Sequence, residues 1–355
     1  MRVPHSAKAS IAALALTALV IGCGGDSTAP DAPFDPAGTS SDIAAIDASF
    51  ESPATAGFAA ASGSISTVLG GSPAALAVKA MPTKSLIAGG KKGVSHYATT
   101  VAKAYRQPSG NGAAYVTAAS IPAEYLGVTF TYNVDTDQYE ASEVTGAPEN
   151  GVRFLVYAVN PISGLIIEPL VEVGYADIVT TESASAVTVR VELVSAGVTY
   201  LDYLVGVTGS TNSATVSVSG YVSNGDDRVN FDLDTHLTST ALTADYVLIV
   251  PTRNGFRMDF EGTITETSSN SRLEARGAHG TVVVTGEHAG TSGTFEVTVN
   301  GDLFATIEYT QGQEPVITGA DGQPLTEQEL EALGNVFEVF IEGFDFVEDL
   351  VDPLT

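Results

Sequence analysis

Apolar and polar residues alternate along this chain with a period of two, beginning near Val128 and continuing for roughly 190 residues. The alternation is strictest in segments 229–237 and 255–265, where nearly every second residue is apolar. Such a pattern is typical of β-strands with one buried face and one solvated face. Less regular strands are predicted at 128–134, 137–144, 151–159, 165–179, 186–195, 197–208, 214–223, 241–250, 280–287, 293–300 and 302–310.

Short turn sequences separate these segments, and four contain an Asn-Gly step, a strong signal for a β-hairpin: Asn150-Gly151, Asn224-Gly225, Asn254-Gly255 and Asn300-Gly301. The connections are too short for crossover helices, so the strands are predicted to form an antiparallel meander. A twisted sheet rarely stays open beyond about ten strands. We therefore predict a mainly β fold over residues 124–320, whose large sheet curls into a barrel, a half-barrel or a sandwich.

The last segment, 321–355, has the period of an amphipathic helix. It begins with a capping-box sequence, Thr326-Glu327-Gln328-Glu329. Apolar residues then recur at spacings of three and four: Leu330, Leu333, Phe337, Phe340, Phe344, Val347 and Val351. A coiled-coil seam is the alternative, but the aromatic residues and two glycines favour packing on the chain's own sheet. The prediction is a C-terminal helix that packs on the β domain.

Residues 41–123 are rich in Ala, Gly and Ser. The spacing of apolar residues predicts short helices at 41–50 and 95–106, and the segment is otherwise expected to be loosely helical or partly disordered. From residue 52 to 123 it carries six basic residues and no acidic one, whereas residues 124–355 carry seven arginines against 36 acidic residues. This change in charge indicates a module boundary near Pro122.

The first 23 residues form a segment of another kind. Arg2 and Lys8 precede an apolar run, 11–21, which leads into Val20-Ile21-Gly22-Cys23. This arrangement resembles the lipoprotein signal peptides of bacteria. The resemblance covers residues 1–23 only, and it implies that residues 1–22 are removed and that Cys23 carries the lipid. An ordinary secretory signal is the alternative, whereas a transmembrane anchor needs about 20 apolar residues.

Cys23 is also the only cysteine in the chain, so the chain has no intrachain disulfide and no thiolate zinc site. Residues 23–40 are rich in Gly, Pro, Ser, Thr and Asp and are predicted to be a flexible tether with a reach of roughly 25 Å. In some bacteria an Asp directly after the lipidated cysteine retains a lipoprotein at the inner membrane. Gly24 occupies that position here, so the lipid is expected to anchor the protein in the outer membrane, on either its periplasmic or its surface side.

The mature chain is strongly acidic. Loss of Arg2 and Lys8 with residues 1–22 leaves 13 of the 15 basic residues against 42 acidic ones, a formal net charge of −29. Like charges repel over a Debye length of about 8 Å at physiological salt. This charge opposes nucleic acid or an anionic bilayer as the partner of the main domain.

The two strictly alternating strands place ionisable residues on a common solvated face: Asp232, Asp234 and His236 on one, and Arg257, Asp259 and Glu261 on the other. Paired carboxylates can hydrolyse glycosidic bonds, and a histidine among acids can bind calcium or zinc. An acidic protein with one-sided strands shows such faces throughout, so a solvated surface is the favoured interpretation.

Other patterns predict no site. His279, Glu287 and His288 lie too far apart along one extended strand to share a metal ion, and Asp135-Thr136-Asp137 lacks the later ligands of an EF-hand loop. Gly89-Gly90-Lys91-Lys92 lacks P-loop spacing, the chain contains no G-x-S-x-G motif, and it contains no tryptophan. No catalytic, metal-binding or cofactor-binding residue is assigned and no cofactor is expected, which leaves Cys23 as the one assigned site.

Three functions are compatible with these features. The favoured one is a non-catalytic envelope lipoprotein that binds an apolar ligand or a protein partner. The second is a hydrolase that acts on envelope or extracellular polymers through Asp and Glu. The third is an adhesion or surface structural module. An empty apolar cavity would support a carrier, a cleft with two close carboxylates a hydrolase, and a filled core neither.

Overall fold

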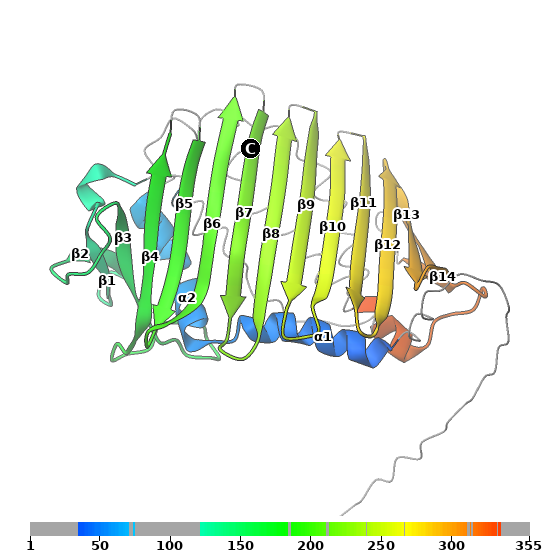
Figure 1. Cartoon of the computed structure of the whole chain (residues 1–355), viewed down its shortest axis with the longest axis horizontal. Coiled ribbons are helices and arrows are strands. Elements are labelled where there is room, and N and C mark those ends of the chain that lie inside the picture. The colour runs from blue at the N-terminus through cyan, green and yellow to red at the C-terminus, as the bar shows by residue number, and fades with distance from the viewer. Residues whose placement is uncertain are drawn as a thin grey trace, which may run out of the picture. The chain divides into compact units, whose positions relative to one another are not determined.

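The computed structural model describes residues 35–70, 74 and 121–334, apart from short gaps at 184–185, 211–212, 239, 266, 311–312, 314 and 332. Two helices, α1 (Pro36–Ser49) and α2 (Pro53–Leu69), precede a short 3-10 helix, η1 (Ala123–Tyr125), and fifteen strands (Figure 1). The strands are β1 (Thr129–Asn133), β2 (Gln138–Ser142), β3 (Gly151–Tyr157), β4 (Glu172–Glu182), β5 (Ala186–Ser195), β6 (Val198–Ser210), β7 (Ser213–Ser223), β8 (Arg228–Thr238), β9 (Ala241–Val250), β10 (Phe256–Thr265), β11 (Ser268–Gly277), β12 (Gly280–Ala289), β13 (Ser292–Val299), β14 (Asp302–Thr310) and β15 (Val316–Gly319).

The fifteen strands form one sheet, and from β3 to β15 each strand pairs antiparallel with the next one in the sequence. The predicted mainly β meander is therefore confirmed. At the other end the order is β3-β1-β2, and β1 pairs with β3 in parallel. The sheet is open, because β2 and β15 are its two edges and do not pair with each other. The barrel and the two-sheet sandwich, both offered as alternatives from the sequence, are wrong.

The edge formed by β2 shows why closure does not occur. The outward-facing backbone N–H of Tyr139 donates a hydrogen bond of 3.2 Å to Oγ of Ser64 on α2. A helix thus occupies a position that a closing strand would need. Both edge strands are also short, at five and four residues, which is a common way of protecting a sheet edge.

Three of the four Asn-Gly steps lie in hairpin turns, as predicted, and the fourth does not. Asn254-Gly255 and Asn300-Gly301 lie in the β9–β10 and β13–β14 turns, and both residues of each pair have positive φ, as a type I′ turn requires. Asn224-Gly225 lies in the β7–β8 turn. Asn150-Gly151 does not link a hairpin, because β3, which starts at Gly151, pairs with β1 and β4 and not with β2.

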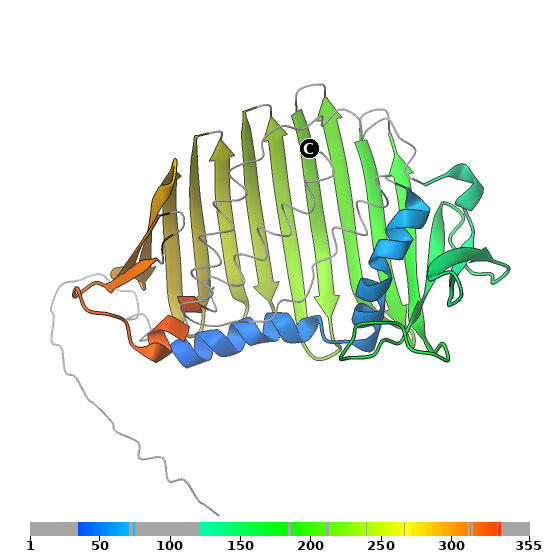
Figure 2. The same ribbon diagram turned by 180° about the vertical axis from the view of Figure 1, so that it is seen from behind.

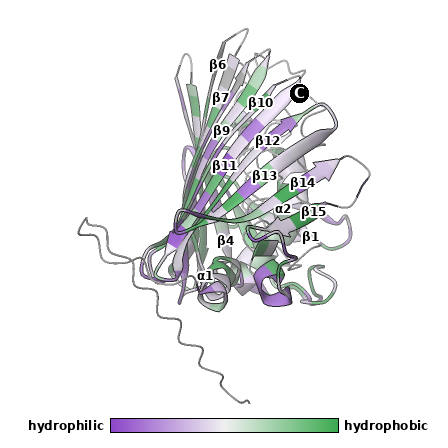
Figure 3. Cartoon of the chain, turned by 90° about the vertical axis from the view of Figure 1, so that its right-hand side faces the viewer, coloured by the Kyte–Doolittle hydropathy of each residue, from purple (hydrophilic) through white to green (hydrophobic). Residues whose placement is uncertain are grey.

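The alternation seen in the sequence separates the two faces of the sheet, as Figure 3 shows by the mixture of hydrophilic and hydrophobic residues along each strand. We call the face that contacts α2 the inner face; Val189, Val205, Val218 and Leu233 belong to it and are fully buried. The opposite, outer face carries mainly hydroxyl and charged side chains. Aromatic rings on the inner face cover glycines of neighbouring strands: Phe295 lies over Gly286 and Tyr309 over Gly293.

The two N-terminal helices contact different parts of the sheet (Figure 2). Helix α2 packs on β2 to β6, and α1 contacts β8 and β9. Hydrogen bonds attach both ends of α1 to turns: Nδ2 of Asn224 donates to the carbonyl of Ala48 at 2.7 Å, and the amide of Asp35 donates to the carbonyl of His279 at 3.0 Å. Fourteen helical residues span about 21 Å, and the four strand spacings between these turns span about 19 Å. The length of α1 therefore matches the distance it bridges.

Local sequence explains where both helices begin. Oδ1 of Asp35 accepts hydrogen bonds from the amides of Ala37 and Gly38, and Pro36 occupies the first helical position. Residues 36–40, predicted to belong to the flexible tether, are therefore the first turns of α1, and the helix expected from residue 41 starts five residues earlier. Helix α2 begins with a reciprocal capping box between Ser52 and Thr55.

The predicted C-terminal helix begins where the capping box placed it. The amide of Thr326 donates to Oε2 of Glu329 at 2.8 Å, and the amide of Glu329 donates to Oγ1 of Thr326 at 3.3 Å. Leu333, one of the predicted apolar positions, is buried. The positions from Phe337 onward lie outside the described residues, as do the predicted helix at 95–106 and the signal segment 1–23. In the part of the chain that the structure describes, no helix is long and apolar enough to cross a membrane.

Candidate functional site

The outer face of the sheet is the candidate functional surface, because it gathers the ionisable residues of nine neighbouring strands, β4 to β12. Antiparallel register aligns the outward side chains of successive strands into rows that cross the sheet. The residues singled out in the sequence fall on this face, on β8 and β10, with β9 between them. The register of strand pairing shows which of these side chains lie next to one another.

Three acidic residues lie directly opposite one another on adjacent strands. Asp234 of β8 pairs with Asp245 of β9, which pairs in turn with Glu261 of β10. We call these three residues the acidic row. Directly opposed side chains in an antiparallel sheet have Cβ atoms about 4.5–5.5 Å apart, and like charges at that separation are destabilising. All three side chains are exposed, so solvent reduces the repulsion without removing it.

Asp232 adds to the same charge, two residues before Asp234 on β8. Desolvation raises the pKa of the Asp232 carboxyl, and the negative charge of Asp234 raises that pKa further. The acidic row does not form a metal site in this structure: among the described residues, no three His, Asp or Glu side chains are placed to hold a metal ion. The carboxylates of the acidic row and of Asp232 therefore extend along the surface of the sheet.

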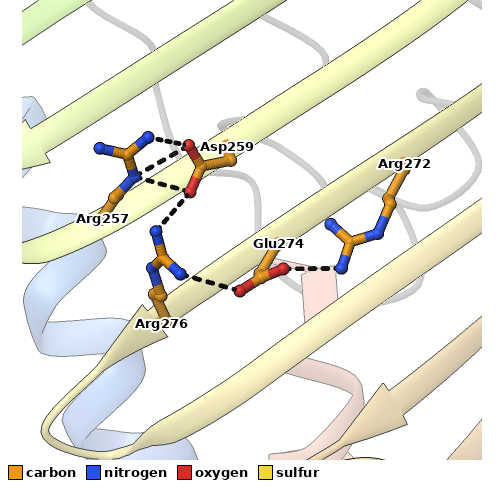
Figure 4. Close-up of polar contacts among 5 residues, drawn as sticks. All are labelled: Arg257, Asp259, Arg272, Glu274 and Arg276. Carbon is orange, nitrogen blue, oxygen red and sulfur yellow. Dashed lines mark hydrogen bonds and ion pairs between the residues drawn. The ribbon is translucent and has the colours of Figure 1, made fainter.

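A network of arginines and carboxylates lies beside the acidic row, on β10 and β11 (Figure 4). We call it the arginine network; it consists of Arg257, Asp259, Arg272, Glu274 and Arg276. Arg257 and Arg276 both contact Asp259, at 2.5 and 3.4 Å, and Arg276 also reaches Glu274 at 3.4 Å. Arg272 contacts Glu274 at 2.6 Å. Hydrogen bonding to Asp259 raises the pKa of the Arg257 guanidinium.

The arginine network holds three cations and two carboxylates, whereas the acidic row next to it holds three carboxylates. Glu261 of the acidic row is directly opposite Arg272, but the short contact of Arg272 is with Glu274. The outer face is thus not evenly mixed in charge. Arginines and carboxylates form ion pairs on β10–β11, whereas carboxylates lie next to one another on β8–β10.

A hollow of about 560 Å³ lies at one end of β11 to β14, and its lining combines outward residues with Ser269, His288, Gly293 and Tyr309 of the inner face. Glu287, Thr294 and Glu308 are directly opposite one another across it, so a hydroxyl separates its two carboxylates. The two glutamate backbones are two strand spacings, about 9.6 Å, apart. The rest of the outward lining consists of small residues: Ser268, Asn270, Ala289, Ser292 and Thr310.

The remaining histidines do not join this surface into a catalytic centre. His236 lies on the outer face, where its Nδ1 is 3.0 Å from Oγ1 of Thr215. His279 lies in the β11–β12 turn, with Nδ1 3.4 Å from Asp35 and Nε2 3.8 Å from Asp42, so it holds the start of α1. His288 is buried on the inner face, where its ring stacks on Tyr309.

His279, Glu287 and His288 therefore point to different places, as their spacing along the chain had indicated. Nine residues of extended chain separate the two histidines by about 30 Å. The Asp135-Thr136-Asp137 segment forms the β1–β2 turn, where the amide of Asp135 donates to Oδ1 of Asn133 and Asp137 has a φ of 56°. These contacts are those of a turn.

The inner-face side chains of β5 to β8 are closely covered. Side chains such as Val191, Val205, Val218 and Leu233 have no exposed surface at all. A cavity able to admit water would leave accessible area on the side chains that line it. These four side chains on β5 to β8 therefore line no open cavity.

Sequence reasoning identified Asp232, Asp234, Asp259 and Glu261 as residues of one solvated face, but it missed Asp245. The alternation of β9 is less regular than that of its neighbours, and only the strand register places Asp245 between Asp234 and Glu261. Comparison with protein-family models, with curated proteins and with solved structures found no match to this chain.

Proposed function

We propose that this chain is a non-catalytic lipoprotein of the bacterial envelope that binds a protein partner through the outer face of its sheet, and that the bound surface of the partner is rich in lysine and arginine. The observation that carries the proposal is the acidic row. Asp234, Asp245 and Glu261 face one another with like charge, and the arginines beside them already have carboxylate partners.

The energetic argument is that a cationic partner relieves a repulsion present in the free protein. Opposed like charges destabilise a strand pair, whereas a lysine or arginine placed over three carboxylates gains attraction from each of them. The strong net negative charge of the chain would also speed the encounter with such a partner.

The outer face is large enough for a stable complex. The nine strands β4 to β12 span about 38 Å, and ten residues of each extend for about 33 Å, which gives roughly 1,300 Å² of planar surface. A standard interface buries about 800 Å² on each partner. A partner of ordinary size can therefore bind to this face alone.

The geometry bears on two alternatives that the sequence offered, a carrier of an apolar ligand and a hydrolase. A carrier needs an apolar cavity, and the fully buried inner-face side chains of β5 to β8 line none. A hydrolase needs its carboxylates in a cleft that orients the substrate, and the acidic row lies on an exposed sheet surface. An adhesion module remains compatible with the proposal, because adhesion is one use of such a binding face.

Attachment to the membrane rests on the N-terminal sequence. Cys23 is proposed to carry the lipid and residues from 24 to the start of α1 to separate the domain from the bilayer. The Cys23→Ser protein is expected to appear in the soluble fraction. Retention of that variant in membranes after a carbonate wash would contradict the proposed anchor.

Binding to poly-L-lysine tests the acidic row directly. Fluorescence anisotropy of a labelled poly-L-lysine is measured against the full chain, against the triple variant Asp234→Asn, Asp245→Asn, Glu261→Gln, and against a control of equal charge. The control is Glu143→Gln, Glu149→Gln, Asp226→Asn, which neutralises three exposed acids outside the strands of the outer face. Both variants change the net charge by the same amount.

The proposal predicts that the acidic-row variant weakens binding at least tenfold while the control weakens it less than threefold. Equal loss in the two variants would show that poly-L-lysine responds to net charge and not to this face. That result would overturn the proposed function.

A further inference from the structure

A second pocket lies at the opposite end of the sheet from the hollow over β11–β14. It has a volume of about 310 Å³ and lies between α2, the β1–β2 hairpin and the loop that connects β3 to β4. Its lining consists of Ala60, Ala61, Ser64, Thr67, Tyr132, Asp137, Gln138, Gly164, Leu165 and Ile166. This volume is that of a site for a small ligand or for one side chain of a partner.

Backbone hydrogen bonds hold the loop side of the pocket in place. The amide of Asn160 donates to the carbonyl of Leu165, and the amide of Gly164 donates to the carbonyl of Asn160, both at 2.8 Å. Oδ1 of Asn160 also accepts hydrogen bonds from the amides of Ile162 and Ser163. Leu165 at the pocket mouth is 69% exposed, so this ordered turn presents an apolar side chain to solvent.

The hairpin side of the pocket supplies a negative charge. The hydroxyl of Tyr132 donates to Oδ1 of Asp137, and this hydrogen bond is the largest of the effects that raise the pKa of Tyr132 to about 12. Tyr132 therefore remains a neutral donor at physiological pH and fixes the orientation of the carboxylate. Oδ2 of Asp137 has no hydrogen bond to any other described residue.

The helix side of the pocket supplies acceptors. Oγ1 of Thr67 donates its proton to the carbonyl of Gly63 at 2.9 Å, which leaves the lone pairs of that oxygen for an incoming donor. Ser64 and Gln138 add a hydroxyl and an amide oxygen, and Ala60 and Ala61 form an apolar wall. None of the described residues that line the pocket is a lysine, an arginine or a histidine.

We propose that this pocket binds a primary alkylammonium group. The ammonium would donate to Oδ2 of Asp137 and to Oγ1 of Thr67, and its alkyl stem would lie against Leu165, Ile166 and the alanines of α2. An ammonium has three donors and no acceptor, which matches a pocket of a carboxylate and oxygen acceptors. The ring of Tyr132 adds a face to which a cation is attracted.

The same chemistry is carried by a free alkylamine and by the lysine side chain of a protein. An anion is excluded by the Asp137 carboxylate and by the nearby negative charge of Glu168, which also acts on Tyr132. The proposal does not depend on the acidic row, since the pocket and the row lie on different elements.

Isothermal titration of the full chain with three six-carbon probes tests the proposal: hexylammonium, hexanol and hexanoate. They share an alkyl stem and differ in the charge of the head group. Hexylammonium is expected to bind at least tenfold more tightly than hexanol, and hexanoate is expected to show no binding. Equal affinity for hexylammonium and hexanol, or no binding of hexylammonium, would overturn the proposal.

Asp137→Asn is the matching variant, because asparagine tolerates the positive φ of this position and keeps an oxygen for Tyr132. It is expected to reduce the affinity for hexylammonium at least tenfold, and Asp135→Asn in the same turn less than twofold. Equal effects of the two substitutions would contradict the assignment to Asp137. A further titration with Nα-acetyl-lysine amide distinguishes the sources: binding as tight as that of hexylammonium indicates a protein lysine, and much weaker binding indicates a free amine.

Discussion

Replacement of Gly57 by alanine tests how closely α2 approaches the sheet. A Cβ atom at this position would lie 2.4 Å from the backbone oxygen of Tyr157 and 2.7 Å from Cγ1 of Val156, both on β3. Contacts under 3.0 Å are essentially never made by a real Cβ. Because the nearest atom belongs to the backbone of β3, which is held by its neighbouring strands, the helix has to move, and the absence of a side chain at Gly57 allows α2 to dock.

Gly63 provides a matched control within the same helix. A Cβ atom there would have nothing within 4 Å. Alanine in place of glycine inside a helix stabilises it by about 0.5–1 kcal/mol, and this gain applies at both positions. Overpacking at Gly57 costs about 1–3 kcal/mol in addition. The free energy of unfolding is therefore expected to rise by about 0.5–1 kcal/mol in Gly63→Ala. In Gly57→Ala it is expected to lie about 1–3 kcal/mol below the value of Gly63→Ala.

Urea denaturation followed by circular dichroism measures both values, and the difference between the two variants cancels the helix-propensity contribution. Equal stabilisation by the two substitutions would refute the docking of α2 on β3. The packing of Phe58, which is fully buried one residue along the helix, would then also need another explanation.

Two further predictions concern ionisable groups. Burial lowers the pKa of the His288 imidazole, so the unfolded chain takes up this proton near pH 6.5 while the folded chain does not. The free energy of unfolding is therefore expected to fall as the pH drops below about 6.5, by at most about 1.4 kcal/mol per pH unit. His288→Phe should flatten that dependence in urea titrations between pH 5 and 8. Arg153–Asp177 and Arg190–Asp202 are both bidentate, but the side chains of the first pair are 19% and 16% exposed and those of the second 46% and 24%. Asp177→Asn should therefore cost about 1–3 kcal/mol and Asp202→Asn less than about 1 kcal/mol, and equal costs would contradict the role given to burial.

The strands and their two faces could be predicted from the sequence because both follow from local alternation. Val229, Phe231 and Leu233 are buried on the inner face, and Asp232 and Asp234 are exposed on the other. The start of the C-terminal helix was predictable for the same reason, since a capping box is a local signal. The start of α1 was also signalled locally, by Asp35 before Pro36, but the composition of the tether obscured it.

The openness of the sheet and the composition of the site depend on contacts between distant segments. The hydrogen bond from Tyr139 to Ser64 joins residues 75 positions apart, and no local pattern reports it. The parallel pairing of β1 with β3 likewise contradicts what Asn150-Gly151 suggested. The acidic row requires the register of three strands, and the pocket beside Asp137 requires a helix, a hairpin and a loop to converge.

Cysteine accessibility in native membranes tests most directly whether the outer face is a binding surface. Cys23 is the only cysteine of the chain and its thiol is expected to be blocked by lipid, so one introduced cysteine can be followed alone. Thr243→Cys places a thiol on β9 two residues from Asp245, and Asp226→Cys places one in the exposed β7–β8 turn. Maleimide labelling rates are compared in isolated membranes and in the detergent-purified full chain. We predict that Thr243→Cys reacts several-fold more slowly in membranes, that high salt restores its rate, and that Asp226→Cys reacts equally in both. Equal rates for Thr243→Cys in the two preparations would contradict a partner bound to the outer face.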